Sequence, residues 1–330
     1  MATVCAFVLT RNRKVLLVEC LRALLAQTHP VDRVIVLDNA SSDSTAEHLR
    51  AEGLLDDRRV ELHRSEENTG GAGGYAEGIR LGIEAARDWL WLMDDDAEPE
   101  PEALERLLSA PPAGAPRTVG LCSEVVHSDG RIDPLHRCRM ARFIVPLPQE
   151  AHRPGTYAEV GCASFVGLLV RTEAARTVGL PRAEFFIGYD DAEWSLRLRH
   201  HGELRLVPES VLVHKIPVGG GEQTRRSRFW NRVLGQHYTS STWEGFWKDL
   251  YRVRNFMAIK HGYGRIGPLA FAGLTGAYLA KSLMYDPRPL PRLPWIVRYA
   301  VKGRREDFSG PTPAEWVGTA RQADSMNSAS

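Results

Sequence analysis

The sequence predicts an α/β protein with a doubly wound, mostly parallel sheet and a helical C-terminal region. Three observations lead to this fold class. The first hundred residues alternate continuously apolar runs with stretches whose apolar residues recur at helical spacing. A polar cluster follows each apolar run, as expected where strands buried on both faces come to an end. After residue 221 the patterns are mostly helical and rich in Arg and aromatic residues.

Strands and helices are expected in strict alternation before residue 100, because apolar runs of strand length alternate there with helical spacing. In order they are strand Val4–Thr10, helix Lys14–Gln27, strand Arg33–Leu37, helix Asp43–Glu52, strand Val60–His63, helix Gly71–Ala86 and strand Trp89–Met93. This order implies parallel strands joined by helices, and such sheets bind ligands beyond the carboxyl ends of their strands.

Beyond residue 101 the alternation loosens, and the predicted domains are residues 1–220, a helical and basic region 221–320, and a disordered tail 321–330. A glycine hinge is expected at Gly219–Gly221. The later elements are a helix beginning near Pro99, strands Val119–Val126 and Phe165–Val170, helix Ala192–His200, and short strands Arg205–Val207 and Val211–Val213.

Composition narrows the class of protein. The chain has 330 residues, 43% of them hydrophobic, which is enough for one large domain or two modest ones. With 42 basic against 41 acidic residues, the chain does not look like a general nucleic-acid binder. Residues 221–310 nevertheless hold 16 of the basic and 6 of the acidic side chains. This excess indicates a local anionic partner, a phosphate-bearing substrate or a membrane face, or else a solvated helical surface.

The cysteines and the apolar segments predict where in the cell the protein is located. Five cysteines, an odd number without a CxxC pair, predict a reduced, cytoplasmic chain. Met1–Thr10 lacks a basic leading region, so no signal peptide is expected. Ile266–Ala280 is too short and too interrupted by Gly and Pro to span a bilayer of about 30 Å. It is interpreted as a packed helix, with peripheral membrane contact left open.

Four polar clusters follow the first four predicted strands, and these are Thr10–Arg13, Asp38–Asn39, Asn68–Gly74 and Asp94–Asp96. Because the carboxyl ends of parallel strands meet at one edge of a sheet, the clusters are expected to converge. Three adjacent carboxylates repel one another unless a cation neutralises them, and Mg²⁺ or Mn²⁺ is the natural partner. Asp94 and Asp96 would face the ion while Asp95 points elsewhere. The alternative is an acidic loop that caps the next helix.

Two later features are also candidates. In Asp190-Asp191-Ala192-Glu193, one Asp can cap the following helix and Glu193 can pair with Arg197, which leaves one Asp free to act as a general base. His214 ends a short strand and is either a metal ligand or a structural histidine.

The glycine-rich stretch Asn68–Gly74 opens a helix with backbone amides that could bind an anion. It contains Gly71-x-Gly73-x-x-Ala76, which matches the dinucleotide fingerprint but follows the third strand rather than the first. An oxidoreductase that uses NAD or FAD, and a sugar nucleotidyltransferase, are therefore kept as alternatives.

Taken together, these motifs resemble inverting family-2 glycosyltransferases of the GT-A fold. The residues that carry the resemblance are Thr10, Asn12, Arg13, Asp38, Asn39, Ser41, Asp43, Asn68, Gly70, Gly71, Asp94, Asp95, Asp96, Asp190, Asp191, Glu193 and His214. They extend from about Val4 to His214, and together with Gly303–Phe308 they are most similar to the galactofuranosyltransferase and rhamnosyltransferase branch.

The resemblance implies a role for each matching residue. Thr10, Arg13, Asp38 and Asn68 would hold a uridine diphosphate, and Asp95 would lie towards the donor sugar. Asp94, Asp96 and His214 would bind Mn²⁺ or Mg²⁺. Asp191 would be the catalytic base, with Asp190 as the second choice.

The resemblance also implies partners. A UDP-sugar is the favoured donor and a dTDP-sugar the second, with a glycolipid or a small molecule as acceptor. No nucleic-acid partner is expected. A cytoplasmic location, contact with the inner membrane face and a homo-oligomer are further expectations, the last two left open.

Overall fold

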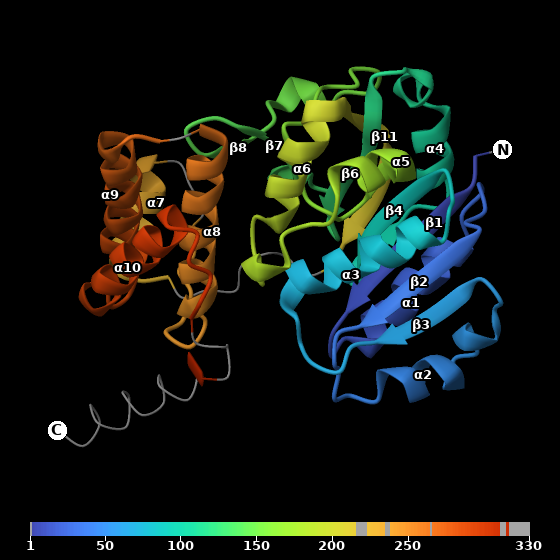
Figure 1. The fold of residues 1–330 in the computed structure, drawn as a ribbon, viewed down its shortest axis with the longest axis horizontal. Helices are drawn as coiled ribbons and strands as arrows, with labels where there is room; N and C mark the ends of the chain where they lie inside the picture. The colour runs from blue at the N-terminus through green and yellow to red at the C-terminus, as the bar shows by residue number, and fades with distance from the viewer. Residues whose placement is uncertain (1, 216–222, 235–237, 265, 311–314, 317–330) are drawn as a thin grey trace. The chain divides into compact units, whose positions relative to one another are not determined.

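The computed structural model describes residues 2–215, 223–234, 238–264, 266–310 and 315–316. The chain divides into two compact units (Figure 1). The first consists of Met1–Phe186 and Asp190–Pro217, and the second of Ile187–Tyr189 and Val218–Ser330. The predicted hinge Gly219–Gly221 and the predicted tail 321–330 lie outside the described residues.

The first unit is built on an eight-stranded sheet in the order β3-β2-β1-β4-β10-β6-β11-β5. Neighbours β3, β2, β1 and β4 run parallel, as do β6 and β11, whereas β10 and β5 are antiparallel to their neighbours. The strands of this sheet are β1 (Val4–Thr10), β2 (Arg33–Asp38), β3 (Val60–Arg64), β4 (Trp89–Asp94), β5 (Ala97–Pro99), β6 (Thr118–His127), β10 (Leu168–Arg171) and β11 (Glu203–His214). The four strands predicted before residue 100 are confirmed in position and direction.

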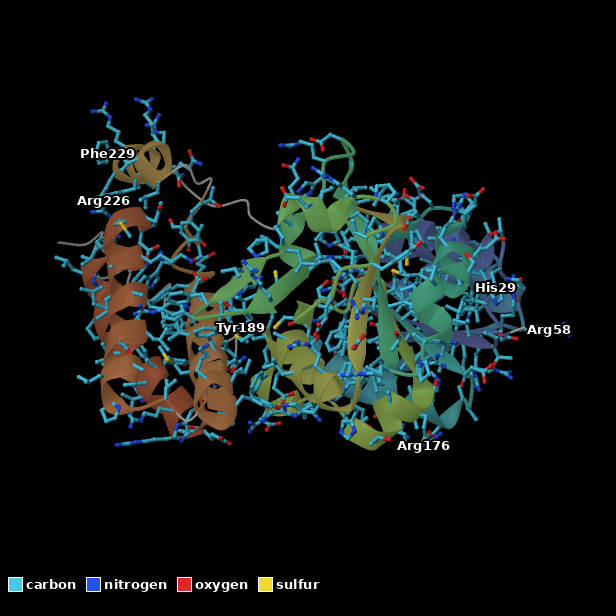
Figure 2. All side chains as sticks on the ribbon, turned by 90° about the horizontal axis from the view of Figure 1, so that it is seen from above. His29, Arg58, Arg176, Tyr189, Arg226 and Phe229 are labelled. Atoms are coloured by element: carbon cyan, nitrogen blue, oxygen red, sulfur yellow. The ribbon has the colours of Figure 1, made fainter. Side chains whose placement is uncertain are left out.

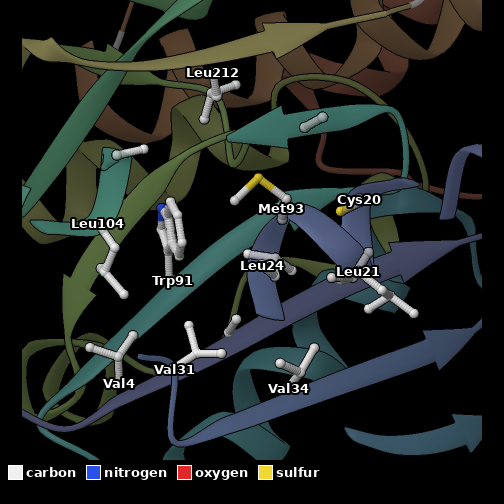
Figure 3. Packing of buried hydrophobic residues seen from close by; sticks show 14 of the residues in the cluster. Val4, Cys20, Leu21, Leu24, Val31, Val34, Trp91, Met93, Leu104 and Leu212 are labelled. Atoms are coloured by element: carbon white, nitrogen blue, oxygen red, sulfur yellow. The ribbon is translucent and has the colours of Figure 1, made fainter. Parts of the chain in front are cut away.

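Helices cover both faces of the sheet, since alternate side chains of a strand point to opposite faces. Val4 of β1 packs in the cluster that includes Leu21 of the first helix (Figure 3). Phe7 of the same strand packs in a second cluster with Ile79 of the third helix. The helices of this unit are α1 (Lys14–Leu25), α2 (Thr45–Ala51), α3 (Gly70–Glu84), α4 (Ala103–Ser109), α5 (Thr172–Val178) and α6 (Asp190–His201). The predicted doubly wound arrangement is confirmed.

Helix α3 lies unusually close to the sheet because glycines recur every fourth residue on its inner face. A Cβ at Gly74 would collide with Leu9, one at Gly78 with the ring of Phe7, and one at Gly82 with Leu90. The four-residue spacing places these positions on one side of the helix. Part of the glycine-rich signal in the sequence therefore reflects close packing of helix on sheet.

Three predictions in the second half of this unit are wrong in detail. The segment after Asp96 forms strand β5 on the edge of the sheet, and α4 begins at Ala103 rather than near Pro99. Strand β10 begins at Leu168 instead of Phe165, because Gly167 has φ +69° and is not extended. The two short strands predicted after Arg205 are one strand, β11, whose register shifts between Val207 and Val211. Pro208 lies inside this shift, where a residue without an N–H costs no ladder hydrogen bond.

A smaller antiparallel sheet in the order β8-β7-β9 completes the first unit. Its strands are β7 (Arg137–Met140), β8 (Ile144–Pro146) and β9 (Cys162–Ala163). It follows a single turn of 3-10 helix, Pro134–His136. None of these elements was anticipated, because the segments are short and carry no regular apolar spacing.

The second unit is helical in its described residues, as expected. Its helices are α7 (Arg225–Leu234), α8 (Phe246–Gly264), α9 (Pro268–Tyr285) and α10 (Leu293–Arg304). Helix α9, which contains most of the apolar run, buries Leu274 and Tyr285 but leaves Leu269 90% exposed, so it packs along one side. Among the residues described, no helix is both long and apolar enough to span a membrane.

Candidate active site

The polar clusters at the ends of the first four strands meet, as predicted. The Oγ1 of Thr10, at the end of β1, donates to Oδ2 of Asp95 at 2.8 Å. The amide of Asn12 donates to Oγ of Ser41, beyond the end of β2, at 2.9 Å. Hydrogen bonds between side chains and loops thus hold the carboxyl edge of the sheet together, and residues that lie up to 85 positions apart become neighbours.

Asn39 connects β2 to the start of α3. Its Oδ1 accepts from the amide of Thr69 at 3.0 Å, and its Nδ2 donates to the carbonyl of Gly70 at 2.9 Å. Gly70 has φ +73°, and a Cβ there would collide with the carbonyl of Phe186, so only glycine fits.

The amides at the start of α3 are already occupied. The amide of Thr69 donates to Oδ1 of Asn39, and the amide of Gly70 donates to Oδ1 of Asn68 at 3.1 Å. The amide of Ala72 donates to the carbonyl of Phe186 at 3.1 Å. The expectation of bare amides ready for an anion is wrong for these three groups. Their bonds instead fix the rim of the site and join it to the segment that leads into α6.

Each member of the Asp94–Asp96 triplet has its own surroundings. Asp94, at the end of β4, accepts a hydrogen bond from the hydroxyl of Tyr75. Asp95 is buried and accepts from Thr10 and from Nη1 of Arg13, the latter at 3.1 Å. Asp96 accepts from the same Nη1 at 2.8 Å. The middle carboxylate therefore contacts the end of β1 through Thr10, and it shares Arg13 with Asp96.

His214 reaches Asp96 through strand pairing. The chain turns after Asp96 into β5, which pairs antiparallel with β11, so that His214 lies beside Ala97. His214 Nε2 is 3.2 Å from Asp96 Oδ1. One ligand atom each from Asp94, Asp96 and His214 lie within 4.8 Å of one another. Two carboxylates and an imidazole at this separation form a set that suits Mn²⁺ or Mg²⁺.

The pKa directions indicate a site in which carboxylates repel one another and are also close to basic side chains. Burial, followed by the charge of Asp96, raises the pKa of Asp94 to about 7, although Tyr75 opposes the shift. Burial would also raise the pKa of Asp96, but contact with His214 and the charges of His214 and Arg13 outweigh it and lower that pKa. Burial would lower the pKa of His214, but Asp96 raises it. A bound cation would relieve the repulsion between the carboxylates.

Arg13 and Asp95 have contacts that the resemblance did not suggest. The guanidinium of Arg13 bridges Asp95 and Asp96. The oxygens of Asp95 accept from groups of the β1 end and the residues after it, namely Thr10, Arg11 and Arg13. The roles of Arg13 on the diphosphate and of Asp95 on the donor sugar stay predictions.

Asp38 and Asn68 belong to the same edge of the sheet, where Asp38 pairs in register with Thr10. Asp38 is fully buried at the end of β2, and its Oδ1 accepts from the amide of Ser41 at 2.8 Å. Its Oδ2 is buried without a hydrogen-bond partner among the described residues, and Arg64 Nη1 lies 3.9 Å away. Asn68 Oδ1 accepts from Nδ2 of Asn39 at 3.3 Å. An acceptor such as Oδ2 of Asp38 suits the N–H or O–H of a ligand.

Asp190 and Asp191 begin α6, and the predicted pair of Glu193 with Arg197 is confirmed at 2.8 Å. The charge of Asp190 contributes, after burial and Asp94, to raising the pKa of Tyr75. Oδ1 of Asp191 accepts from the amide of Ala192 at 2.6 Å.

Three residues of this region were missed from the sequence, namely Tyr75, Asp133 and His136. The ring of Tyr75 stacks on Phe165 at 4.0 Å between ring centres, so it looked like an ordinary core position. The ring of His136 lies 5.0 Å from that of His214. The sequence gives no signal for Asp133 and His136, because they stand between elements without a regular pattern.

Comparison with known proteins decides the family. The profile of Glycosyl transferase family 2 matches residues 5–179, more than half of the chain. The chain belongs to this family. A galactofuranosyltransferase, GlfT1 of Mycobacterium tuberculosis, is 32% identical over 315 residues, which are 94% of this chain and 98% of that protein. GlfT1 of Mycolicibacterium smegmatis is 30% identical over 207 residues, 60% of this chain and 66% of that protein.

Two solved glycosyltransferases share the fold. A GalNAc-T7 structure with UDP, GalNAc and Mn²⁺ has a TM-score of 0.56 and 15% identity, and the match covers 84% of this chain and 55% of that one. A mannosyltransferase of Pyrobaculum calidifontis with GDP-Man and Mn²⁺ has a TM-score of 0.54 and 17% identity, with coverage of 99% and 80%. The predicted α/β fold of the GT-A type, with a helical C-terminal region, is confirmed.

The chain is therefore a family-2 glycosyltransferase. The oxidoreductase alternative rested on Gly71-x-Gly73-x-x-Ala76, which lies in α3 after β3 and not after the first strand. The match to the glycosyltransferase family therefore leaves the oxidoreductase alternative without support. The same match removes the support for a sugar nucleotidyltransferase.

Proposed function

We propose that this glycosyltransferase is metal-dependent and inverting, and that it transfers galactofuranose, a related furanose or rhamnose from a nucleotide diphosphate. The favoured donor is a UDP-sugar, and the acceptor is a hydroxyl of a cell-wall glycolipid or a natural product. The observation that carries the proposal is the group of Asp94, Asp96 and His214 at the carboxyl edge of the sheet. The similarity to galactofuranosyltransferases over 94% of the chain supports the sugar class.

The residues at this edge fit a divalent ion. Asp94 and Asp96 offer carboxylate oxygens, and Asp96 already contacts the guanidinium of Arg13 and the imidazole of His214. When bound, the ion would neutralise charge that develops on the departing diphosphate. Tyr75 holds Asp94 in place through its hydroxyl. Arg13 is positioned to exchange a carboxylate for a phosphate oxygen, because its guanidinium reaches both Asp95 and Asp96.

Asp38 supplies the recognition of the nucleoside in this proposal. Its buried Oδ2 lacks a hydrogen-bond partner in the described structure, and a uracil N–H or a ribose hydroxyl would satisfy it. Thr10 and Asn68 would hold the uridine diphosphate together with Asp38 and Arg13. Thr10 is itself hydrogen-bonded to Asp95, and Asn68 to Asn39.

Asp191 is the proposed general base, and Asp190 is the second choice. The base takes the proton of the acceptor hydroxyl while that oxygen attacks the anomeric carbon from the face opposite the diphosphate. A single displacement inverts the configuration and needs no covalent intermediate. Asp190 stands directly before Asp191 at the start of α6.

Thermal shift tests the donor and the metal together. Binding to the folded state raises Tm by mass action, so UDP, dTDP and GDP are compared with NAD, each with Mn²⁺ and with EDTA. A UDP shift that requires Mn²⁺ is the expected result. A larger dTDP shift would move the donor to a dTDP-sugar such as one carrying rhamnose. A shift with NAD alone, independent of metal, would overturn the proposal.

Asp191→Asn tests the base. The variant should keep the Mn²⁺-dependent UDP shift and lose about 10²- to 10⁴-fold in transfer rate, the usual contribution of a general base. Asp190→Asn is the matched variant and should retain more activity. If transfer survives in Asp191→Asn and fails in Asp190→Asn, the two roles are reversed.

Contact with a membrane face belongs to the same proposal, and α7 supports it. Its buried positions are Ser227 and Asn231, both polar. The apolar side chains of Phe229 and Val233 are 59% and 56% exposed. Figure 2 labels Phe229 together with Arg226 of the same helix. Arg residues flank Phe229 and Val233, and no acidic residue lies in this helix, so the outward face is both apolar and cationic. Such a face is typical of helices that lie in the interface of an anionic bilayer.

A further inference from the structure

A second group of potential metal ligands adjoins the first and shares one residue with it. One ligand atom each from Asp133, His136 and His214 lie within 4.8 Å of one another. All three side chains are buried, with exposed fractions of 3%, 6% and 5%. Asp133 directly precedes the 3-10 turn after β6, His136 is the last residue of that turn, and His214 ends β11. A turn and a strand end therefore supply the group.

Hydrogen bonds fix the side chains of Asp133 and His136 so that they contact each other. Oδ1 of Asp133 accepts from the amide of Leu135 at 3.1 Å, and its Oδ2 lies 3.4 Å from Nε2 of His136. Nδ1 of His136 pairs with Oγ of Ser164 at 2.7 Å, which fixes the ring with Nε2 facing Asp133. A second hydrogen bond of this kind is the usual way in which a metal-binding histidine is held.

Two nitrogens in the group are buried without a hydrogen-bond partner. Within the part of the chain that the structure describes, these are Nε2 of His136 and Nδ1 of His214. Nε2 of His214 lies 3.2 Å from Oδ1 of Asp96, so we assign the other ring nitrogen, Nδ1, to the second group. Nε2 of His136 lies 3.4 Å from Oδ2 of Asp133, but the contact lacks hydrogen-bond geometry. Buried polar atoms ordinarily have hydrogen-bond partners, so these two ring nitrogens indicate a place for a ligand.

We propose that Asp133, His136 and His214 form a second divalent-metal site, selective for Zn²⁺, and that zinc bound there inhibits the enzyme. Two imidazole nitrogens and a carboxylate oxygen, with a fourth position left for water, are a typical three-residue zinc set. Imidazole ligands favour Zn²⁺ over Mn²⁺, whereas Mg²⁺ prefers oxygen. The inhibition rests on the proposed function, in which His214 holds the ion of the donor site.

Inhibition follows from the single lone pair of His214. A neutral imidazole carries a proton on one nitrogen and a lone pair on the other, so it binds one ion at a time. With Nε2 as ligand, His214 joins Asp94 and Asp96. With Nδ1 as ligand, it joins Asp133 and His136. Zinc in the second group therefore withdraws His214 from the first, and the two ions compete.

Zinc binding is measured first, on the full chain stripped of metal, with neither donor nor Mn²⁺ present. Zn²⁺ is titrated against a chromogenic indicator for the wild type, His136→Ala, His136→Gln, Asp94→Ala and His48→Ala. His48 lies on α2 and is the matched histidine control. We expect one zinc per chain, at least tenfold weaker binding in both His136 variants, and no change in Asp94→Ala or His48→Ala. Circular dichroism confirms that each variant is folded.

Several results would overturn the second site. One is equal zinc affinity in the wild type and in both His136 variants. Another is loss of zinc binding in Asp94→Ala rather than in the His136 variants, which would place zinc in the first group. Absence of zinc binding in the wild type would also overturn it.

The competition is measured separately. Zn²⁺ is added to the wild type and to His136→Gln, and the Mn²⁺-dependent UDP shift is recorded. The wild type should lose the shift at zinc concentrations at least tenfold lower than the variant requires. Equal zinc sensitivity would refute the inhibition. If the wild type shows no UDP shift with Mn²⁺ yet binds zinc through His136, the proposed function fails and the zinc site stands.

Discussion

Tyr75 is the residue at which the hydrophobic core and the candidate site meet. Its ring stacks on Phe165 and lies edge-on to Phe7, while its hydroxyl donates to Asp94. Burial and the nearby carboxylates raise the pKa of Tyr75 well above its ordinary value, so the phenol stays protonated and able to donate. A residue that packs as core thereby orients a proposed metal ligand.

Tyr75→Phe should preserve the fold and weaken metal binding. A hydrogen bond to a charged group contributes about 1.5–3 kcal/mol, so the Mn²⁺ concentration that gives half of the UDP shift should rise roughly tenfold or more. Tyr263→Phe, at an exposed position of α8, is the control. An unchanged Mn²⁺ requirement in Tyr75→Phe would show that the hydroxyl does not support Asp94.

Asp38, Asp94 and Asp96 were predictable one residue at a time, because each follows or ends a recognisable strand. Tyr75 and His136 were not, because a tyrosine in an amphipathic helix and a histidine in a loop are common in any protein. Their place near the candidate site depends on which other segments they meet.

At the scale of the element, two glycine-to-alanine variants in α3 test whether the close packing of this helix on the sheet requires glycine. A Cβ at Gly78 would enter the ring of Phe7, whereas nothing lies within 4 Å of one at Gly71. Gly78→Ala should lower the free energy of unfolding by about 1–3 kcal/mol, as overpacking does. Gly71→Ala should leave it unchanged or raise it by up to about 1 kcal/mol, since alanine favours a helix. Urea denaturation measures both, and equal effects would contradict this account.

Helix α7 offers a second test at this scale. Phe229→Ser and Val233→Ser, introduced together, should reduce sedimentation with vesicles that contain anionic phosphatidylglycerol, because both side chains are more than half exposed. Unbound protein should keep its Tm, since the buried positions of α7 are Ser227 and Asn231. Equal sedimentation of the variant and the wild type, or none with either, would remove α7 as a membrane contact.

At the scale of the whole molecule, all five cysteines are buried thiols that are not joined in disulfides. Burial raises the pKa of Cys5 and of Cys138 to about 12 and that of Cys122 to about 11. The thiolate is the reactive form, so at pH 8 the folded protein should react with a disulfide reagent far more slowly than a free thiol does. After denaturation all five thiols should react, and a fast-reacting thiol in the folded chain would contradict the structure.

The sequence by itself determined the alternating strands and helices, the parallel direction of the first four strands and the polar residues at their ends. Apolar periodicity is a local property, and the carboxyl ends of parallel strands share one edge whatever the details of packing. It also carried the resemblance to a glycosyltransferase family, since the motifs are short and stand in a fixed order.

Only the tertiary structure decided which partner each polar group meets. Strand β5 pairs with β11, which places His214 opposite Ala97 and in contact with Asp96. No apolar periodicity in the sequence predicted strand β5. The turn after β6 places Asp133 and His136 against the same histidine. Such contacts join residues far apart in the chain, and they depend on the strand order, on bulges and on loop paths. A local pattern contains none of these, because they arise only when the whole first unit packs.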